Sequence, residues 1–240
     1  MPSFTSMVPS DVEMHKRYQS IVSSELFAAT TAAPHIMWMV NMLTRCMAYP
    51  PKELLGMAER LVAHLYHRRH QYKLRYTRDS NLVCDFAPDI LEGASDSSFE
   101  QERSTSGYVF IFALAAIAWC TRKQKSIALS SFEGEIMAAS LAACDAVFLR
   151  GLLAFLGHPQ DAPTVIRIDS SSAVAVAKDP MHHAKSKHII RRDLYIRELA
   201  DAGIIEPKLI KTANNPADIF TKHVDRVPFQ KHCATIYNIA

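Results

Sequence analysis

Cysteine is scarce in this sequence, and its pattern excludes two common ways of building a small protein. The five cysteines among 240 residues are odd in number and widely spaced, and none forms a Cys-x-x-Cys pair. This pattern argues against a disulfide framework and against a cysteine zinc site. We therefore expect a reducing, intracellular compartment, and the sequence does not choose between a cytoplasmic particle and the nucleus.

The sequence also offers little that would hold it in a membrane. The apolar, charge-free stretch 108–120 is shorter than the roughly 20 residues that span a bilayer, and it falls where a β-hairpin is expected. Residues 1–9 lack the charged start and the apolar block of a secretory leader. We expect no membrane partner. With 49% apolar residues, the chain can build one domain with a core plus an appendage.

Acidic residues stand at the expected ends of two strands. Asp96 precedes two apolar segments within 108–120 that have the pattern of neighbouring strands, and we expect it at a strand end. Asp169 closes the β-branched run 164–168, and the serines at 170–172 can cap the helix that follows. Open α/β sheets place their ligands at such strand-to-helix junctions.

Two further acids stand at the expected starts of helices. Glu135 opens the apolar run 136–156, which preceding serines can cap and which Gly157 can stop. In the segment 214–220 an asparagine caps the helix, a proline takes its first position, and Asp218 falls one turn in. All four acids would project from rigid element ends.

Carboxylates gathered at one point suit hard divalent cations such as Mg²⁺, which prefer oxygen ligands. Two such ions about 3.5–4 Å apart can generate a hydroxide on one side of a phosphorus and stabilise the departing oxygen on the other. Without metal the carboxylates would repel one another, and some would bind protons. With 24 acids in 240 residues, simple solvation of each acid at the surface remains the alternative.

A series of motifs resembles one protein family. They include Ser-Thr-Ser-Gly-Tyr-Val-Phe and Ala-Asp-Ile-Phe-Thr-Lys, and they lie at 95–99, 103–110, 116–124, 128–135, 168–173, 186–189 and 217–222. In this order they resemble the ribonuclease H domain at the end of the Pol polyprotein of copia-type long-terminal-repeat retrotransposons. Upstream, the segments 17–26, 33–45 and 58–65 are similar to the part that joins the reverse transcriptase to this domain.

The resemblance implies a ribonuclease H that cuts the RNA strand of RNA–DNA hybrids with two Mg²⁺ ions, for which Mn²⁺ can substitute. The family's four carboxylate ligands carry over onto Asp96, Glu135, Asp169 and Asp218. A reverse transcriptase domain encoded upstream is the implied partner. The paired aspartates of the polymerase do not occur in this chain, so we do not expect it to polymerise.

A basic segment between Asp169 and Asp218 is a candidate substrate contact. It runs beside an apolar stripe in 189–202, so that one face of a helix can pack while the other meets phosphates. A solvated helix face is the alternative. The residues that we predict to bind substrate are Lys185, Lys187, His188, Arg191 and Arg192.

These observations predict an α/β protein with a ribonuclease H-like fold, a mixed five-stranded sheet flanked by helices, at about 83–232. A helical segment similar to the reverse-transcriptase connection precedes it at 1–78, with a linker at 77–82, and a tail follows at 233–240. We expect strands from about 83, 108, 115, 164 and 204, and helices from about 132, 171, 187 and 215. Pro207 places the last strand at a sheet edge.

One departure from the family concerns the hairpin after the Ser-Thr-Ser-Gly-Tyr motif. Family members usually turn it with glycines, whereas residues 112–116 contain none. Because other residues resist the positive φ of tight turns, we expect this turn to be rebuilt or loosened.

Two other functions remain open. The chain could be a non-catalytic nucleic-acid-binding remnant of a retroelement, decayed or adopted by its host. It could instead be a fold relative that cuts DNA, such as an integrase or resolvase, although those enzymes usually have three acids in a different order.

Overall fold

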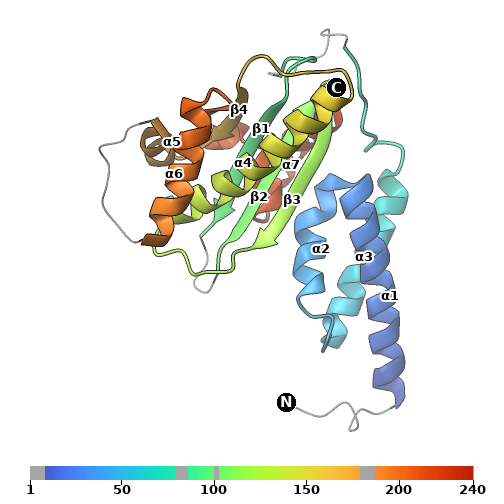
Figure 1. Cartoon of the computed structure of the whole chain (residues 1–240). Coiled ribbons are helices and arrows are strands. Elements are labelled where there is room, and N and C mark those ends of the chain that lie inside the picture. Colours follow the sequence, from blue (N-terminus) through green and yellow to red (C-terminus); the bar gives the residue numbers. More distant parts are fainter. Residues whose placement is uncertain (1–8, 79–85, 100–102, 179–186, 240) are drawn as a thin grey trace. The chain divides into compact units, whose positions relative to one another are not determined.

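The structure is a computed structural model that describes residues 9–78, 86–99, 103–178 and 187–239 (Figure 1). The chain divides into two compact units, Met1–Lys73 and Leu74–Ala240. Residues 74–78, expected in the N-terminal segment, instead hydrogen-bond within the second unit: the amide of Arg75 donates to Tyr237 and that of Thr77 to Ala113.

The first unit is helical, as predicted. It contains α1 (Pro9–Thr31), the short 3-10 helix η2 (Pro34–Ile36), α2 (Met37–Thr44) and α3 (Lys52–Arg68). The helices pack around a small core formed by Tyr18, Val22, Leu43 and Ala58. The Tyr18 hydroxyl donates to the Leu43 carbonyl at 2.8 Å, which ties α1 to α2.

The second unit contains a mixed five-stranded sheet in the order β3-β2-β1-β4-β5. Its strands are β1 (Glu92–Ser98), β2 (Thr105–Phe112), β3 (Ala115–Lys123), β4 (Thr164–Ile168) and β5 (Ile205–Leu209). The first three are antiparallel neighbours, whereas β4 runs parallel to β1 and β5 parallel to β4. The predicted sheet is confirmed, and Pro207 lies in an edge strand, β5, as expected.

The first strand begins later than the sequence suggests. Its expected start, 83–85, lies outside the described residues, and residues 86–91 form bends and turns before β1 begins at Glu92. Pro88 explains the delay, because proline has no amide hydrogen to donate to a strand partner.

Of the two expected outcomes, a rebuilt or a loosened turn, the loosened one is wrong, because the β2–β3 turn is tight. Ala113 has φ 52° and Leu114 has φ 65°, and these two residues alone connect the strands. Positive φ at both central residues is the geometry that matches the twist of a hairpin. Leu114 is buried, and the Ala113 amide donates to the Pro88 carbonyl at 2.8 Å. These contacts hold two non-glycine residues in a strained conformation.

The helices of this unit include α4 (Ser131–Phe155), α5 (Ser171–Lys178) and α6 (Lys187–Asp201). The Ser130 side chain caps α4 by accepting from the Glu133 amide, and Gly157, with φ 85°, follows its end. The core joins α4 to the sheet through residues such as Phe110, Ile136 and Ile166. Among the described helices, α4 alone is long and apolar enough to cross a membrane, but 56% of that window is buried within the protein, as in a core helix.

The C-terminal residues form a packed helix and no tail. After the 3-10 helices η3 (Thr212–Asn214) and η4 (Pro216–Phe220), α7 runs from Arg226 to Tyr237. Cys233, Ile236 and Tyr237 are fully buried. Local composition does not reveal this burial, because α7 is covered by contacts with η4 and β3.

Candidate active site

Three aspartates from separate elements meet at the carboxyl ends of β1 and β4. Asp96 lies near the end of β1, Asp169 directly follows β4, and Asp218 lies in η4. One carboxylate oxygen from each lies within 4.8 Å of the others. Asp96 and Asp218 are buried, and Asp169 is half-buried. A group of oxygen donors this close can hold a hard divalent cation.

A glycine in β2 lets η4 approach the sheet and deliver Asp218. Gly107 pairs with Asp96 across the antiparallel ladder. A Cβ at Gly107 would lie 2.7 Å from Cβ of Phe220 and 2.7 Å from Cγ2 of Thr221, which is closer than carbon atoms can approach. Any other residue here would therefore push η4 away from β1.

Asn215 fixes the start of η4 in the way that the sequence predicts. Its side-chain oxygen accepts from the Ala217 amide at 3.1 Å, and Pro216 occupies the first helical position. Its amide nitrogen also donates to the Ser95 carbonyl of β1 at 3.0 Å. This fully buried side chain thus caps η4 and anchors it to the strand that carries Asp96.

Neighbouring residues of β1 serve opposite faces of the sheet, because side chains alternate along a strand. Asp96 faces η4, where its Oδ2 accepts a hydrogen bond from the Thr221 hydroxyl. Ser97 faces α4, where its hydroxyl donates to Glu135 Oε1 at 3.0 Å and its amide donates to the same atom at 3.1 Å.

Glu135 lies beside the three aspartates but outside their tight cluster. Gly134 brings α4 close to β1, since a Cβ there would lie 2.7 Å from the Ser97 hydroxyl oxygen. Glu135 is buried, and its Oε2 has no hydrogen-bond partner among the described residues. A buried carboxylate oxygen left without a partner needs a proton or a cation.

Several carboxyl groups at this end of the sheet have raised pKa values, because they are buried and lie close to one another. Burial, followed by the nearby charges of Asp96 and Asp169, raises the pKa of Glu135 to about 8. Burial and then Asp96 raise the pKa of Asp218 to about 6. Burial also raises the pKa of Asp96, against the opposing effects of Lys222 and Thr221.

Lys222 places a positive charge at the cluster. Its Nζ lies 3.2 Å from Asp218 Oδ1 and 3.5 Å from Asp96 Oδ2. Burial lowers the pKa of Lys222, but Asp96 and Asp218 raise it by more. The ammonium thus marks a place where the protein already accommodates a cation, and the oxygen-only donor set fits a divalent metal.

Not all residues expected from the sequence can be placed at this site. Lys185 lies outside the described residues, and the side chains of Lys187, His188 and Arg191 in α6 do as well. Arg192 lines a cavity beside α4. Sequence reasoning missed Lys222, although its spacing of four residues from Asp218 is a signal for an ion pair.

The sheet order, with acids at the carboxyl ends of two adjacent parallel strands, defines a ribonuclease H-like domain. The fold is similar to that of the foamy viral protease-reverse transcriptase solved with dsDNA, with a TM-score of 0.50. The two chains are 17% identical, and the match covers 82% of this chain and 38% of that chain. LC11-RNase H1, isolated from compost, gives 14% identity and a TM-score of 0.45 over 55% of this chain and 93% of that chain. No protein-family model matches.

Sequence relatives give a narrower comparison. The chain is 33% identical over 220 residues to the Pol polyprotein from transposon TNT 1-94 of Nicotiana tabacum, and 27% identical over 219 residues to that from transposon RE1 of Arabidopsis thaliana. These matches cover 89% and 91% of this chain. The chain is thus similar to one part of the Pol polyproteins of copia-type retrotransposons, and it spans only 16% and 15% of the length of these two relatives.

A third relative is much shorter. Secreted RxLR effector protein 161 of Plasmopara viticola is 30% identical over 138 residues, which cover 55% of this chain and 90% of that protein.

Proposed function

We propose that this chain hydrolyses the RNA strand of RNA–DNA hybrids with the help of divalent metal ions. The observation that carries the proposal is the meeting of Asp96, Asp169 and Asp218 within 4.8 Å. Similarity to part of the Pol polyproteins, together with the ribonuclease H-like fold, supports the reaction class. The RNA–DNA hybrid as substrate rests on the sequence resemblance.

The aspartates would be the principal metal ligands. Glu135, held by Ser97 and with its Oε2 without a partner among the described residues, stands ready as an additional ligand. The oxygen-only donor set favours Mg²⁺, with Mn²⁺ as a substitute, over metals that prefer sulfur or imidazole. When bound, a pair of such ions supplies an activated water and stabilises the charge on the leaving oxygen.

The chain's own residues would organise this site before substrate arrives. Asn215 and Gly107 hold η4 against β1. Asp96 and Asp218 therefore already lie close to each other before a cation binds. Lys222 partly neutralises these two acids in the metal-free protein. Such preorganisation reduces the rearrangement required during reaction.

Choice of the RNA strand would come from contacts to its 2′-hydroxyl groups in the shallow minor groove. The predicted basic residues Lys185, Lys187, His188 and Arg191 remain proposals for substrate contact. A reverse transcriptase domain remains the proposed partner, because the matching relatives are far longer polyproteins.

The test is cleavage of a hybrid with labelled RNA by the full chain in Mg²⁺. Asp169→Asn should reduce the rate of cleavage by at least about a thousandfold, because it removes the charge of a metal ligand. Binding of the hybrid should be retained. Asp201→Asn, at an exposed position in the last turn of α6, is the matched control and should cleave normally. Equal activity of Asp169→Asn and the parent would contradict the proposal, as would cleavage of duplex DNA in preference to the hybrid.

A second candidate is a nucleic-acid-binding remnant without catalytic activity. The observation that favours it is the Plasmopara viticola relative, nine-tenths of which aligns with this chain as a short protein. Hybrid binding without cleavage, in both Mg²⁺ and Mn²⁺, would select this candidate.

A further inference from the structure

The outward face of the second half of α4 is apolar and exposed. The opposite side of this helix belongs to the core of the second unit, through buried residues such as Ala146, Leu149 and Leu153. Large apolar side chains on the outward face reach solvent, with exposed fractions of 39% for Val147, 67% for Phe148, 42% for Leu152, 86% for Phe155 and 60% for Leu156. Contiguous apolar surface of this kind marks an interaction site.

The exposed side chains follow a regular pattern along the helix. They fall in three pairs of neighbours, 147–148, 151–152 and 155–156, in which Gly151 is the one small residue. Each pair follows the one before it by four residues, and residues four apart lie on the same side of an α-helix. The pairs therefore form parallel ridges on one continuous face, which we call the α4 face.

No charged side chain interrupts the α4 face. Asp145 and Arg150 are the only charged residues in the range 136–157. Both are used within the second unit, because the Tyr108 hydroxyl donates to Asp145 and Arg150 Nη2 donates to the Gln160 carbonyl at 2.6 Å. The face therefore has no charge that a partner would have to match.

Gly151 lies in the middle of the α4 face and is not required by packing among the described residues. A Cβ at this position would have no atom within 4 Å. Glycine in a helix interior is less favourable than alanine, so the chain bears a cost that its own packing does not explain. A surface that approaches the helix backbone from outside would explain it, because glycine allows the closest approach.

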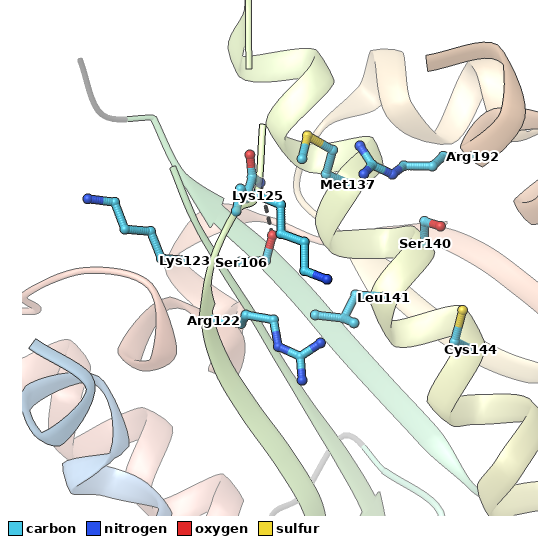
Figure 2. Close-up of a pocket in the computed structure, with 10 residues that line it drawn as sticks. Ser106, Arg122, Lys123, Lys125, Met137, Ser140, Leu141, Cys144 and Arg192 are labelled. Carbon is cyan, nitrogen blue, oxygen red and sulfur yellow. Dashed lines mark hydrogen bonds between the residues drawn. The ribbon is translucent and has the colours of Figure 1, made fainter. Parts of the chain in front are cut away.

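The α4 face is separate from the other features of this helix. Glu135 precedes Gly151 by 16 residues, which is about 24 Å along the helix axis. A cavity of about 190 Å³ lies nearer the start of α4, and Figure 2 shows Cys144 of α4, Arg122 of β3 and Arg192 of α6 around it. None of the residues of the α4 face lines this cavity. A contact on the face therefore leaves the carboxylates open.

We infer that the α4 face binds the same face of a second copy of this chain, with the two α4 helices antiparallel. An uncharged face can meet its own copy without repulsion between like charges. In a two-fold symmetric contact, residue i of one copy contacts residue j of the other, and j contacts i. The face must then have the same character when it is followed in either direction.

The pattern of the α4 face meets this requirement. A two-fold axis between Gly151 and Leu152 sets the glycine of each copy opposite the leucine of the other. The same axis sets Phe148 of each copy opposite Phe155 of the other. The first residue of the first pair and the last residue of the third pair meet in the same way. Ridges of residues four apart interdigitate when two helices cross at about 50°.

The size of the face fits a weak dimer. Aromatic side chains bury about 150–250 Å² each, so two phenylalanines and three partly exposed aliphatic residues offer on the order of 500 Å² per copy. The pair then buries about 1,000 Å² in total, which is near the lower limit for a specific interface. We therefore expect dissociation at micromolar concentrations of the chain.

The first experiment measures the mass of the full chain by sedimentation over a range of concentrations. The parent should pass from monomer to dimer with a dissociation constant on the order of 10 µM. Phe148→Glu alone and Phe155→Lys alone should each raise this constant at least about tenfold, because each places unpaired charges in the contact. Both side chains are more than half exposed, so both variants should fold.

Mixing the two variants tests the register of the contact. In a dimer of Phe148→Glu with Phe155→Lys, the two introduced charges lie opposite each other, and the second contact between phenylalanines is intact. The mixture should therefore dimerise at least about tenfold more tightly than either variant alone. Parallel helices, or a partner other than a second copy, would give no such recovery, and a mixture without recovery overturns the inference.

Gly151→Leu tests whether the glycine serves the contact. Leucine is the better helix former and its Cβ would meet no atom within 4 Å, so the melting temperature of the dilute monomer should rise. The dimer should weaken at least about tenfold, because the added side chain fills the space opposite Leu152 of the second copy. Phe27→Glu, at a 71% exposed position of α1, is the matched control and should dimerise like the parent.

The inference does not depend on the proposed function, and its test does not use hybrid cleavage. A parent chain that stays monomeric at concentrations about twentyfold above the expected dissociation constant overturns it. A dimer that forms equally well in Phe148→Glu also overturns it. Loss of the dimer in Phe27→Glu does so as well, because it assigns the contact to the first unit.

Discussion

The ammonium of Lys222 lies 3.2 Å from Oδ1 of Asp218, four residues earlier in the chain, and 3.5 Å from Oδ2 of Asp96. A single side chain therefore contacts two of the three clustered aspartates. Its charge occupies the region in which a metal ion would be expected.

Replacing this lysine should expose the competition between ammonium and metal. Lys222→Gln should lower the stability of the metal-free protein by about 1 kcal/mol, because Asp96 and Asp218 lose a partner that is itself partly solvent-exposed. Saturating Mg²⁺ should then raise the melting temperature more in the variant than in the parent. Lys208→Gln, on the edge strand β5, is the control. Equal Mg²⁺ shifts in Lys222→Gln and the parent would show that ammonium and metal do not compete.

Gly107→Ala should damage both stability and the site. Its added Cβ would lie 2.7 Å from Phe220 and Thr221, so η4 must move and carry Asp218 away from Asp96. We expect a loss of about 1–3 kcal/mol in unfolding free energy and a large loss of hybrid cleavage. Gly151→Ala in α4 is the contrasting change, since no atom lies within 4 Å of the added carbon. It should stabilise by about 0.5–1 kcal/mol, and a Gly107→Ala protein as stable and active as its parent would refute the account of η4.

The strained hairpin turn predicts a stabilising substitution. Ala113 has φ 52°, a conformation that glycine adopts without the clash of a Cβ. Ala113→Gly keeps the amide hydrogen bond to Pro88 and should raise stability by about 1 kcal/mol, measured by thermal or denaturant unfolding. Leu114 is unsuitable for this test, because its buried side chain would be lost. No gain in Ala113→Gly would mean that the turn carries little strain.

A buried acid in the first unit predicts a pH effect independent of the metal site. Glu25 in α1 is only 2% exposed, and neither carboxyl oxygen has a hydrogen-bond partner among the described residues. Burial raises its pKa to about 7. The folded state therefore holds this proton more tightly than the unfolded state, so the contribution is complete below about pH 4.5 and is lost as pH rises through about 7.

Glu25→Gln should remove this pH dependence, because the amide does not titrate. Hydrogen exchange of α1 amides should show the parent losing about 1 kcal/mol or more of local stability between about pH 5 and pH 8, and the variant losing much less. Glu53→Gln, at the exposed start of α3, is the control. Identical pH profiles for Glu25→Gln and the parent would show that Glu25 does not carry the effect.

Local sequence was sufficient for the elements that position Asp169 and Asp218. The β-branched run 164–168, ended by Asp169, forms β4, and Asn215 with Pro216 begins η4 as predicted. Ser130 and Gly157 likewise set the limits of α4. These features depend on hydrogen bonds and backbone preferences within a few residues, which a single sequence displays directly.

Only the tertiary structure decided how those elements meet. The arrangement of Lys222 between Asp96 and Asp218, the position of Glu135 outside the tight cluster, and the convergence of Arg122 with Arg192 all join distant segments. So does the burial that holds Ala113 and Leu114 in a glycine-like turn. Such relationships depend on strand register and on close approaches such as that of Phe220 to Gly107, and packing sets these distances over the whole fold.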